Sequence, residues 1–334
     1  MKKKIELPLI APIYSTYNNQ GSGSAILATN PSIQNWYYNE VLMLTCTLKF
    51  LNGYSSPEIT VANSIWNENP YLKKQLLNTR FLNGYTNYVI HKLIDEGYYV
   101  YFTEFDDYYI KGKSWYQEKH FPHDGCICGY DDENKTYCIY AYDQNWIYQK
   151  FWTPQSSFEE GRKASARAGK IGYVCGIRPR LDDVPFSPDA ALERIKEYLN
   201  PVLEPQIDKK GDKFVSGIIV HDYIADYIEK LYDGSIPYEK TDRRVLRMIW
   251  EHKKAMLERI RLIEKNLLLG DTTSKSYEDV VKEADSARML YALHHLRRRD
   301  SVLPIIRKKI LSIKSLEYNL LTHLLNHSKG ADKS

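Results

Sequence analysis

The stretch HFPHDGCICGYDDENKTYCIYAYD, residues 120–143, decides the fold of the first half of this chain. The polar residues 131–135 predict a tight turn, and residues 136–142 are rich in the β-branched and aromatic side chains of a strand. The stretch is therefore expected to form a β-hairpin. His123 starts the first strand and Asp143 ends the second, so the hairpin is expected to set an imidazole beside a carboxylate. Such a carboxylate fixes the imidazole tautomer and stabilises its charged form, as a general acid–base catalyst requires.

Two other interpretations of the hairpin stay open. A His and an Asp at neighbouring strand ends also form simple hydrogen-bonded surface pairs. A metal site is the other possibility, because His120, His123, Cys126 and Cys128 all carry ligand atoms. The two cysteines of a C-x-C pattern point to one face of a strand, whereas His123 stands at odd spacing from them and points to the other. That geometry disfavours a shared metal ion.

The segments before the hairpin predict helices and one strand. Residues 1–34 are expected to be irregular, with a flexible loop of Asn, Gln, Gly and Ser at residues 18–24. Residues 35–51 carry a broad apolar face at helical spacing and end at an Asn-Gly pair, so they predict a long helix. The remaining expected elements are a short helix at 71–78, a helix at 86–96 and a strand at 98–105.

Acidic side chains follow the strand expected at residues 98–105. Glu104, Asp106 and Asp107 lie at its end, where they either line a site or belong to a solvated loop. After the hairpin, the elements expected are a strand at 146–152, a short basic helix at 158–169 and a strand at 170–177.

The hairpin also carries a family resemblance. His123, the Gly-Tyr-Asp-Asp stretch at 129–132 and the Tyr-Asp pair at 142–143 resemble the His and Asp segment of papain-like, cysteine-peptidase-related proteins. The narrower group is the butirosin-biosynthesis protein H-like family of antibiotic gene clusters. The resemblance covers residues 30–180, and a weaker one extends into residues 249–256. It implies a papain-like α+β domain, with a central helix packed on an antiparallel sheet, and transfer of acyl groups from carrier proteins to amines.

The sequence departs from this family at the nucleophile. In papain-like folds a cysteine starts the central helix, where the helix N-terminus lowers the pKa of the thiol. Here Trp36 or Tyr37 occupies that place. Cys46 is the candidate nucleophile, being the only cysteine of the helix expected at 35–51, although it lies about 15 Å along the axis. A small buried core residue is the other interpretation of Cys46.

The composition changes near residue 183. Prolines bracket acidic residues there, and every long pattern that follows is helical. We therefore expect a papain-like α+β domain at 1–182 and a helical bundle at 183–334. The expected helices of the bundle cover residues 187–199, 217–232, 242–270, 276–299 and 301–326. They are amphipathic and need one another, which predicts a bundle of four or five helices.

Composition also limits the classes of function. The net charge is +4 with no basic tail, which argues against a dedicated nucleic-acid binder. The five cysteines follow no framework of spacings, which favours a reducing cytoplasm. We expect no membrane-spanning segment and no signal peptide, because no apolar run reaches the required length.

Two functions compete on these grounds. The first is an amide-forming acyltransferase of peptide-antibiotic biosynthesis, which moves an acyl or peptidyl group from a carrier-protein thioester to a small amine. His123 would be base and acid, Asp143 its orienting group and Cys46 the nucleophile. The resemblance implies no cofactor beyond the phosphopantetheine arm of the carrier-protein substrate. Hydrolysis, as in a thiol hydrolase or peptidase, is the neighbouring chemistry.

The second function is binding without catalysis. A catalytically inactive cysteine-peptidase homologue would hold a carrier protein or a peptide, and the missing cysteine at residues 36–37 supports it. The basic stretches 297–299 and 307–309 suit either a solvated face or a dock for an acidic carrier protein. A metal-binding module remains a third interpretation.

Overall fold

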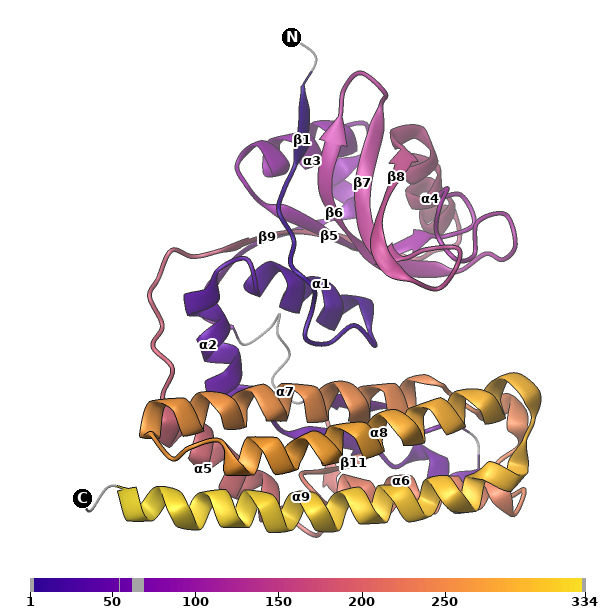
Figure 1. The fold of residues 1–334 in the computed structure, drawn as a ribbon. Helices are drawn as coiled ribbons and strands as arrows, with labels where there is room; N and C mark the ends of the chain where they lie inside the picture. Colours follow the sequence, from indigo (N-terminus) through magenta and orange to yellow (C-terminus); the bar gives the residue numbers. More distant parts are fainter. Residues whose placement is uncertain (1–2, 54, 62–68, 332–334) are drawn as a thin grey trace. The chain divides into compact units, whose positions relative to one another are not determined.

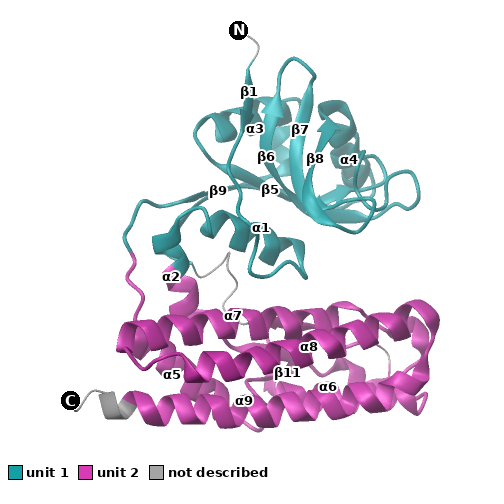
Figure 2. Ribbon diagram, in the orientation of Figure 1, with its two compact units in different colours: residues 1–34, 65–183 teal, residues 35–64, 184–334 magenta. Residues whose placement is uncertain are grey.

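The computed structural model describes residues 3–53, 55–61 and 69–331. The chain forms two compact units (Figures 1 and 2). Unit 1 consists of Met1–Gln34 and Ile65–Asp183, and unit 2 consists of Asn35–Ser64 and Val184–Ser334. A single division at residue 183 would leave Asn35–Ser64 with the first half of the chain, whereas this segment is assigned to unit 2.

Unit 1 is built on a seven-stranded antiparallel sheet. The strand order is β4-β9-β5-β6-β7-β8, and β1 pairs with β6 as well. The strands are β1 (Lys4–Glu6), β4 (Leu72–Asn78), β5 (Tyr99–Asp106), β6 (Pro122–Asp131), β7 (Thr136–Tyr142), β8 (Tyr148–Pro154) and β9 (Tyr173–Pro179). The expected hairpin is present as β6 and β7. The α+β class is confirmed, whereas the papain-like assignment within it stays a prediction.

Helices pack on both faces of this sheet. On one face, α3 (Thr86–Asp95) and α4 (Gln155–Arg167) share a hydrophobic core with the strands, in which Ile90, Phe102 and Phe158 are fully buried. On the other face, α1 (Asn18–Leu27) contacts β6, β7 and β9. The unit therefore has three layers, with the sheet in the middle (Figure 1).

Helix α1 corrects the expectation of a flexible loop at residues 18–24. Glycine and serine lower helix propensity, which is why the segment resembles a loop. Nine of its ten residues are nevertheless buried. The small side chains allow the helix to approach the sheet closely: a Cβ atom on Gly21 would lie 2.5 Å from the ring of Tyr148. Tertiary packing, rather than propensity, holds this helix.

Two further expectations were wrong. The helix expected at residues 35–51 ends early, since α2 covers Pro31–Glu40 and Leu44–Thr47 is strand β2. The short helix expected at 71–78 is strand β4. In β2 the side chains alternate between buried and half-buried, which is the period of a strand. Its apolar residues allow either structure, and pairing with β3 and β11 decides for the strand.

Unit 2 is a helical bundle with a small sheet. The helices are α5 (Pro188–Leu199), α6 (Val220–Tyr232), α7 (Arg244–Leu267), α8 (Thr272–Arg297) and α9 (Leu303–Ala331). The small antiparallel sheet has the order β10-β11-β2-β3, from Gln206–Ile207, Lys213–Ser216, Leu44–Thr47 and Ile59–Val61. Each long helix lies against its neighbours, with α8 between α7 and α9 (Figure 1).

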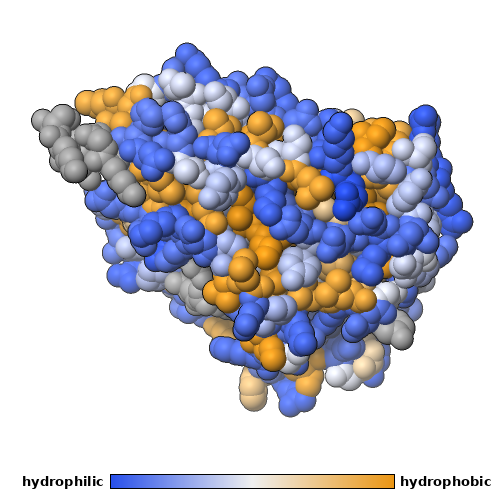
Figure 3. Space-filling view, turned by 90° about the horizontal axis from the view of Figure 1, so that it is seen from below, coloured by the Kyte–Doolittle hydropathy of each residue, from blue (hydrophilic) through white to orange (hydrophobic). Residues whose placement is uncertain are grey.

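The surface of the bundle is mixed. Figure 3 shows hydrophobic patches among hydrophilic side chains on the face seen from below. In the expected basic dock, ion pairs already engage Arg298 with Glu239 and Lys309 with Glu283. Along the described stretches of the chain, none of the helices has the length and apolarity that crossing a bilayer demands.

Candidate functional site

The site is built where β5 ends beside the start of β6. The two strands pair so that Phe105 faces His123. A bulge interrupts the pairing between Phe102 and Phe105, and Glu104 adopts a positive φ of 57° within it. Bulges redirect the side chains that follow them. Asp107, directly after the strand, therefore reaches the imidazole of His123.

A buried ion pair supports one edge of His123. The Nδ1 atom lies 3.2 Å from Asp107 Oδ2 and 3.4 Å from Lys113 Nζ. Lys113 Nζ also lies 3.3 Å from Asp107 Oδ1 and donates to the carbonyl oxygen of Asp124 at 2.7 Å. The Asp107 and Lys113 side chains are completely buried, while His123 is 30% exposed. The Nδ1 edge of the imidazole thus rests on buried groups, while part of the ring is exposed to solvent.

These contacts select one imidazole tautomer. Lys113 is a donor only, and the carbonyl of Asp124 takes its shortest hydrogen bond. The Asp107 carboxylate is an acceptor only, so we assign the Nδ1 proton of His123 to the bond with Asp107. With this assignment Nε2 carries the lone pair of a general base, and the Asp124 Oδ1 atom lies 3.4 Å from it.

The start of helix α1 faces this Nε2 atom. Asn18 Nδ2 lies 3.5 Å from His123 Nε2 and donates to the Oδ1 and backbone oxygens of Asp124 at 2.8 and 3.1 Å. The Asn18 Oδ1 atom is buried and has no hydrogen-bond partner among the described residues. Tyr101 donates its hydroxyl to Asp124, and burial together with that carboxylate raises the pKa of Tyr101. An unused acceptor therefore lies beside the base.

Asp143 does not orient His123, contrary to the sequence-based expectation. Its Oδ1 accepts from the backbone N–H groups of Asn145 and Ile147, and its Oδ2 accepts from the side chain of Gln149. Burial alone raises the pKa of Asp143, but these hydrogen bonds outweigh burial and hold that pKa below its usual value. The carboxylate stabilises the turn between β7 and β8, and its hydrogen bonds go to residues of that turn and of β8 rather than to His123.

Cys46 does not lie at this site. It is a fully buried residue of β2 in unit 2, and burial raises the pKa of its thiol. Burial likewise raises the pKa of Cys126 and of Cys175, and a hydrogen bond to Cys138 followed by burial does so for Cys128. All five cysteines are free and buried. None has the features of a reactive thiolate.

The alternative positions do not supply a nucleophile or a metal site. Trp36 and Tyr37 are buried residues of α2 and belong to unit 2. His120 pairs with Asp106 at 2.8 Å, on its own side of the strand end. Across residues 3–53, 55–61 and 69–331, no three His, Cys, Asp or Glu side chains cluster in a way that could hold a metal ion.

The sequence predicted His123 as a site residue and placed Asp107 in a loop near a possible site, but it did not single out Lys113 or Asn18. The bulge in β5 changes which carboxylate reaches the imidazole, and nothing in the local sequence fixes a bulge. Lys113 comes from the loop between β5 and β6, and its side chain is buried only in the folded unit. The Asn-Asn pair that starts α1 was the available signal, since Asn is favoured at helix starts.

Comparisons with known proteins assign no family to this chain. No model of a known protein family matches the chain, and no curated protein is significantly similar to it in sequence.

Proposed function

We propose that unit 1 transfers an acyl group directly from a carrier-protein thioester to an amine, with His123 as general base and without a cysteine nucleophile. The observation that supports this most strongly is the support of His123 Nδ1 by the buried Asp107–Lys113 pair. That support directs Nε2 to the start of α1. The class of acyl donor and acceptor follows from the family resemblance of the hairpin.

The proposed step needs only acid–base chemistry at His123. The amine nitrogen attacks the thioester carbonyl, a C–N bond forms, and Nε2 takes the proton that the nitrogen loses. The tetrahedral intermediate then collapses, the C–S bond breaks, and the imidazolium returns its proton to the departing thiolate. Asp107 stabilises the imidazolium in between. The products are an amide and the free thiol of the carrier arm.

Asn18 fits the role of an amine-positioning group. Its buried Oδ1 atom is an unused acceptor, and a buried acceptor without a partner costs about 1–3 kcal/mol. An N–H group of the incoming amine would satisfy it beside His123 Nε2. The nearby start of α1 also carries partial positive charge, which favours the developing oxyanion.

The cysteines support direct transfer over a covalent acyl-enzyme. A thiolate nucleophile needs a lowered pKa and some exposure. Cys126 is the cysteine nearest to His123 in sequence, yet it is fully buried and burial raises its pKa. A thioester that reacts directly with an amine, without an acyl-enzyme intermediate, avoids this requirement.

A binding protein is the second candidate. The observation that favours it is Asn18 itself, because a side-chain amide is not a nucleophile and it occupies the helix start that faces His123. Such a protein would hold the acylated arm without turnover.

One experiment separates the two candidates. The probe is an S-acyl phosphopantetheine offered with a panel of small primary amines, and mass spectrometry detects the amide. Acyl transfer predicts amide formation that falls about 100-fold or more in His123→Gln. The exposed His327 provides the control, so His327→Gln is expected to keep the rate. Thioester binding without amide formation, seen for every amine, would support the binding protein instead.

A further inference from the structure

A second His–Asp pair lies beside the site already described. Asp106 and Asp107 are adjacent in the chain, and each pairs with a different histidine. His120 Nδ1 lies 2.8 Å from Asp106 Oδ2, while Asp106 Oδ1 accepts from the backbone N–H groups of Tyr108 and Phe121. The charge of Asp106 is therefore fully engaged, and it fixes the orientation of His120.

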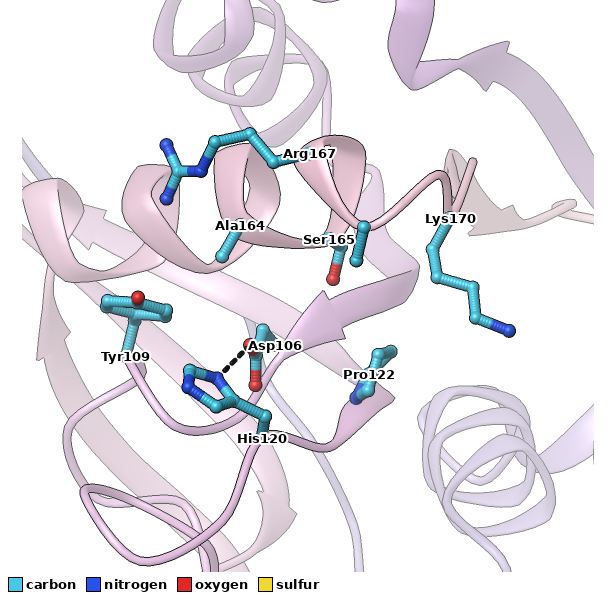
Figure 4. Close-up of a pocket in the computed structure, with 9 residues that line it drawn as sticks. Asp106, Tyr109, His120, Pro122, Ala164, Ser165, Arg167 and Lys170 are labelled. Atoms are coloured by element: carbon cyan, nitrogen blue, oxygen red, sulfur yellow. Dashed lines mark hydrogen bonds and ion pairs between the residues drawn. The ribbon is translucent and has the colours of Figure 1, made fainter.

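This pair opens onto a pocket of about 440 Å³ at the end of helix α4. Figure 4 shows the helix over the end of β5, with Asp106 and Ser165 central and Tyr109, His120 and Pro122 around them. Arg167 and Lys170 are exposed, and Figure 4 shows their side chains extended in opposite directions from the rim of the pocket. The volume is within the range of pockets that bind small organic molecules.

The pocket contains an unused buried hydroxyl. Ser165 is 2% exposed, and its Oγ atom has no hydrogen-bond partner among the described residues. Figure 4 shows this hydroxyl directed from the helix toward Asp106. Since Ser165 makes no hydrogen bond to His120, the group is not a Ser–His–Asp arrangement. A ligand oxygen would satisfy the hydroxyl.

The two cations are not needed by the helix end. Basic side chains often neutralise the last carbonyls of a helix. Here backbone N–H groups already bond these carbonyls: Ala168 to Ala164, Gly169 to Ala166 and Lys170 to Ser165. The cationic side chains of Arg167 and Lys170 therefore remain available to a ligand.

We infer that this pocket binds a small organic phosphate. Arg167 and Lys170 supply positive charge at the rim, and the Ser165 hydroxyl supplies a directed hydrogen bond, which together suit the oxygens of one phosphate. Tyr109 and Pro122 provide an apolar wall for the organic part. The volume leaves room for more than the phosphate alone. This site is separate from the proposed acyl transfer and does not depend on it.

Calorimetric titration with phenyl phosphate tests the inference, with inorganic phosphate as the second probe. Phenyl phosphate is expected to bind more tightly, because its ring contacts the apolar wall. The double variant Arg167→Gln/Lys170→Gln is expected to weaken binding about tenfold or more. Lys163→Gln removes a charge from the same helix outside the pocket and is expected to change affinity less than twofold.

Ser165→Ala separates a built site from diffuse surface charge. The variant removes an unpaired buried hydroxyl, so the free protein is expected to keep its stability while phenyl phosphate binds several-fold more weakly. Equal loss in Lys163→Gln and in the double variant would overturn the inference, as would no heat of binding in the folded wild-type protein. Thermal melting of each variant confirms its folding.

Discussion

Asp107 and Lys113 are an ion pair from which water is excluded on both sides, since neither side chain is exposed. Removing one partner of such a pair leaves an uncompensated buried charge, at a cost of about 3–5 kcal/mol. We expect Asp107→Asn to lower the free energy of unfolding of the protein by that amount. Urea denaturation followed by circular dichroism measures it.

A double variant separates this structural cost from the effect on His123. Asp107→Asn/Lys113→Met removes both charges, so it is expected to recover much of the lost stability. It does not restore the acceptor for the Nδ1 proton, so acyl transfer is expected to stay low. Recovery of activity together with stability would show that Asp107 acts only as a structural partner of Lys113.

The thiols provide a second prediction at the residue scale. All five cysteines are buried, and four of them have a raised pKa. We expect brief treatment with iodoacetamide at pH 7 to label none of them in the folded protein and all five in urea. Intact-mass measurement counts the labels. One rapidly labelled cysteine in the folded protein would point back to a covalent mechanism.

At the scale of single elements, helix α1 depends on glycine. A Cβ atom at Gly21 would lie 2.5 Å from the ring of Tyr148, and overpacking of this kind costs about 1–3 kcal/mol. Alanine has the higher helix propensity by about 1 kcal/mol, so propensity alone predicts the opposite sign. We expect Gly21→Ala to lower the urea midpoint. An unchanged or raised midpoint would mean that α1 does not pack tightly on the sheet.

Helices α7 and α9 share a buried polar cluster. Lys253 Nζ donates to Glu317 Oε2 at 2.6 Å and to Tyr198 at 3.1 Å, and Tyr277 also donates to Glu317. Lys253 and Glu317 are completely buried. The cluster joins helices that are distant in sequence, and buried polar groups can fix the register of a bundle.

A substitution cycle tests this cluster. Lys253→Met is expected to destabilise unit 2 by about 3–5 kcal/mol, because it leaves the Glu317 carboxylate buried without its cation. Lys253→Met/Glu317→Leu is expected to be markedly more stable than the single variant. Urea midpoints give both values, and additive losses would show that the two residues do not interact.

The helices and strands also show how much of the secondary structure could be predicted from the sequence. The long amphipathic helices and the hairpin of β6 and β7 were predicted, because their periodicity extends over many residues. Helix α1 was missed, since its small residues make sense only against Tyr148 in the folded sheet. The strand at Leu44–Thr47 was missed because four residues allow either structure and its partner β11 lies about 170 residues away.

The candidate site shows the same contrast between local sequence and long-range packing. The sequence placed His123 on the hairpin, where local sequence sets the geometry, and its role as a site residue stays a prediction. Its partner was misassigned, because the bulge at Glu104 brings Asp107 to the imidazole and the turn after β7 takes Asp143. Lys113 and Asn18 come from segments that meet only in the folded unit.

For the whole molecule, the buried cluster predicts sensitivity to acid. His221 of α6 belongs to this cluster, with its Nε2 atom 3.8 Å from Glu317 Oε2. Burial is the main cause that lowers the pKa of His221 to about 3, whereas an unfolded histidine takes up a proton near 6.5. Lys253 lowers the pKa of Glu317 to about 2, against the opposing effect of burial. Between pH 6.5 and about 3 the unfolded chain binds a proton at His221 that the folded chain does not bind. Between pH 4.5 and about 2 the same is true of Glu317. Stability is therefore complete above about pH 6.5 and declines toward pH 3.

Urea midpoints at pH 7, 6 and 5 measure this decline. Each buried neutral histidine contributes a slope of about 1.4 kcal/mol per pH unit below pH 6.5. His221→Met is expected to reduce the slope, whereas His327→Gln, at an exposed position, is expected to leave it unchanged. Equal slopes in the wild-type protein, His221→Met and His327→Gln would show that groups other than His221 cause the acid sensitivity.

The central claim is that His123 works without a cysteine. The most direct measurement is the single-turnover rate of amide formation from S-acyl phosphopantetheine, in the wild-type protein and in five variants that each replace one cysteine by alanine. We predict an unchanged rate in every folded cysteine variant and a loss of about 100-fold or more in His123→Gln. A rate abolished in one folded cysteine variant, or one that survives in His123→Gln, would contradict the claim.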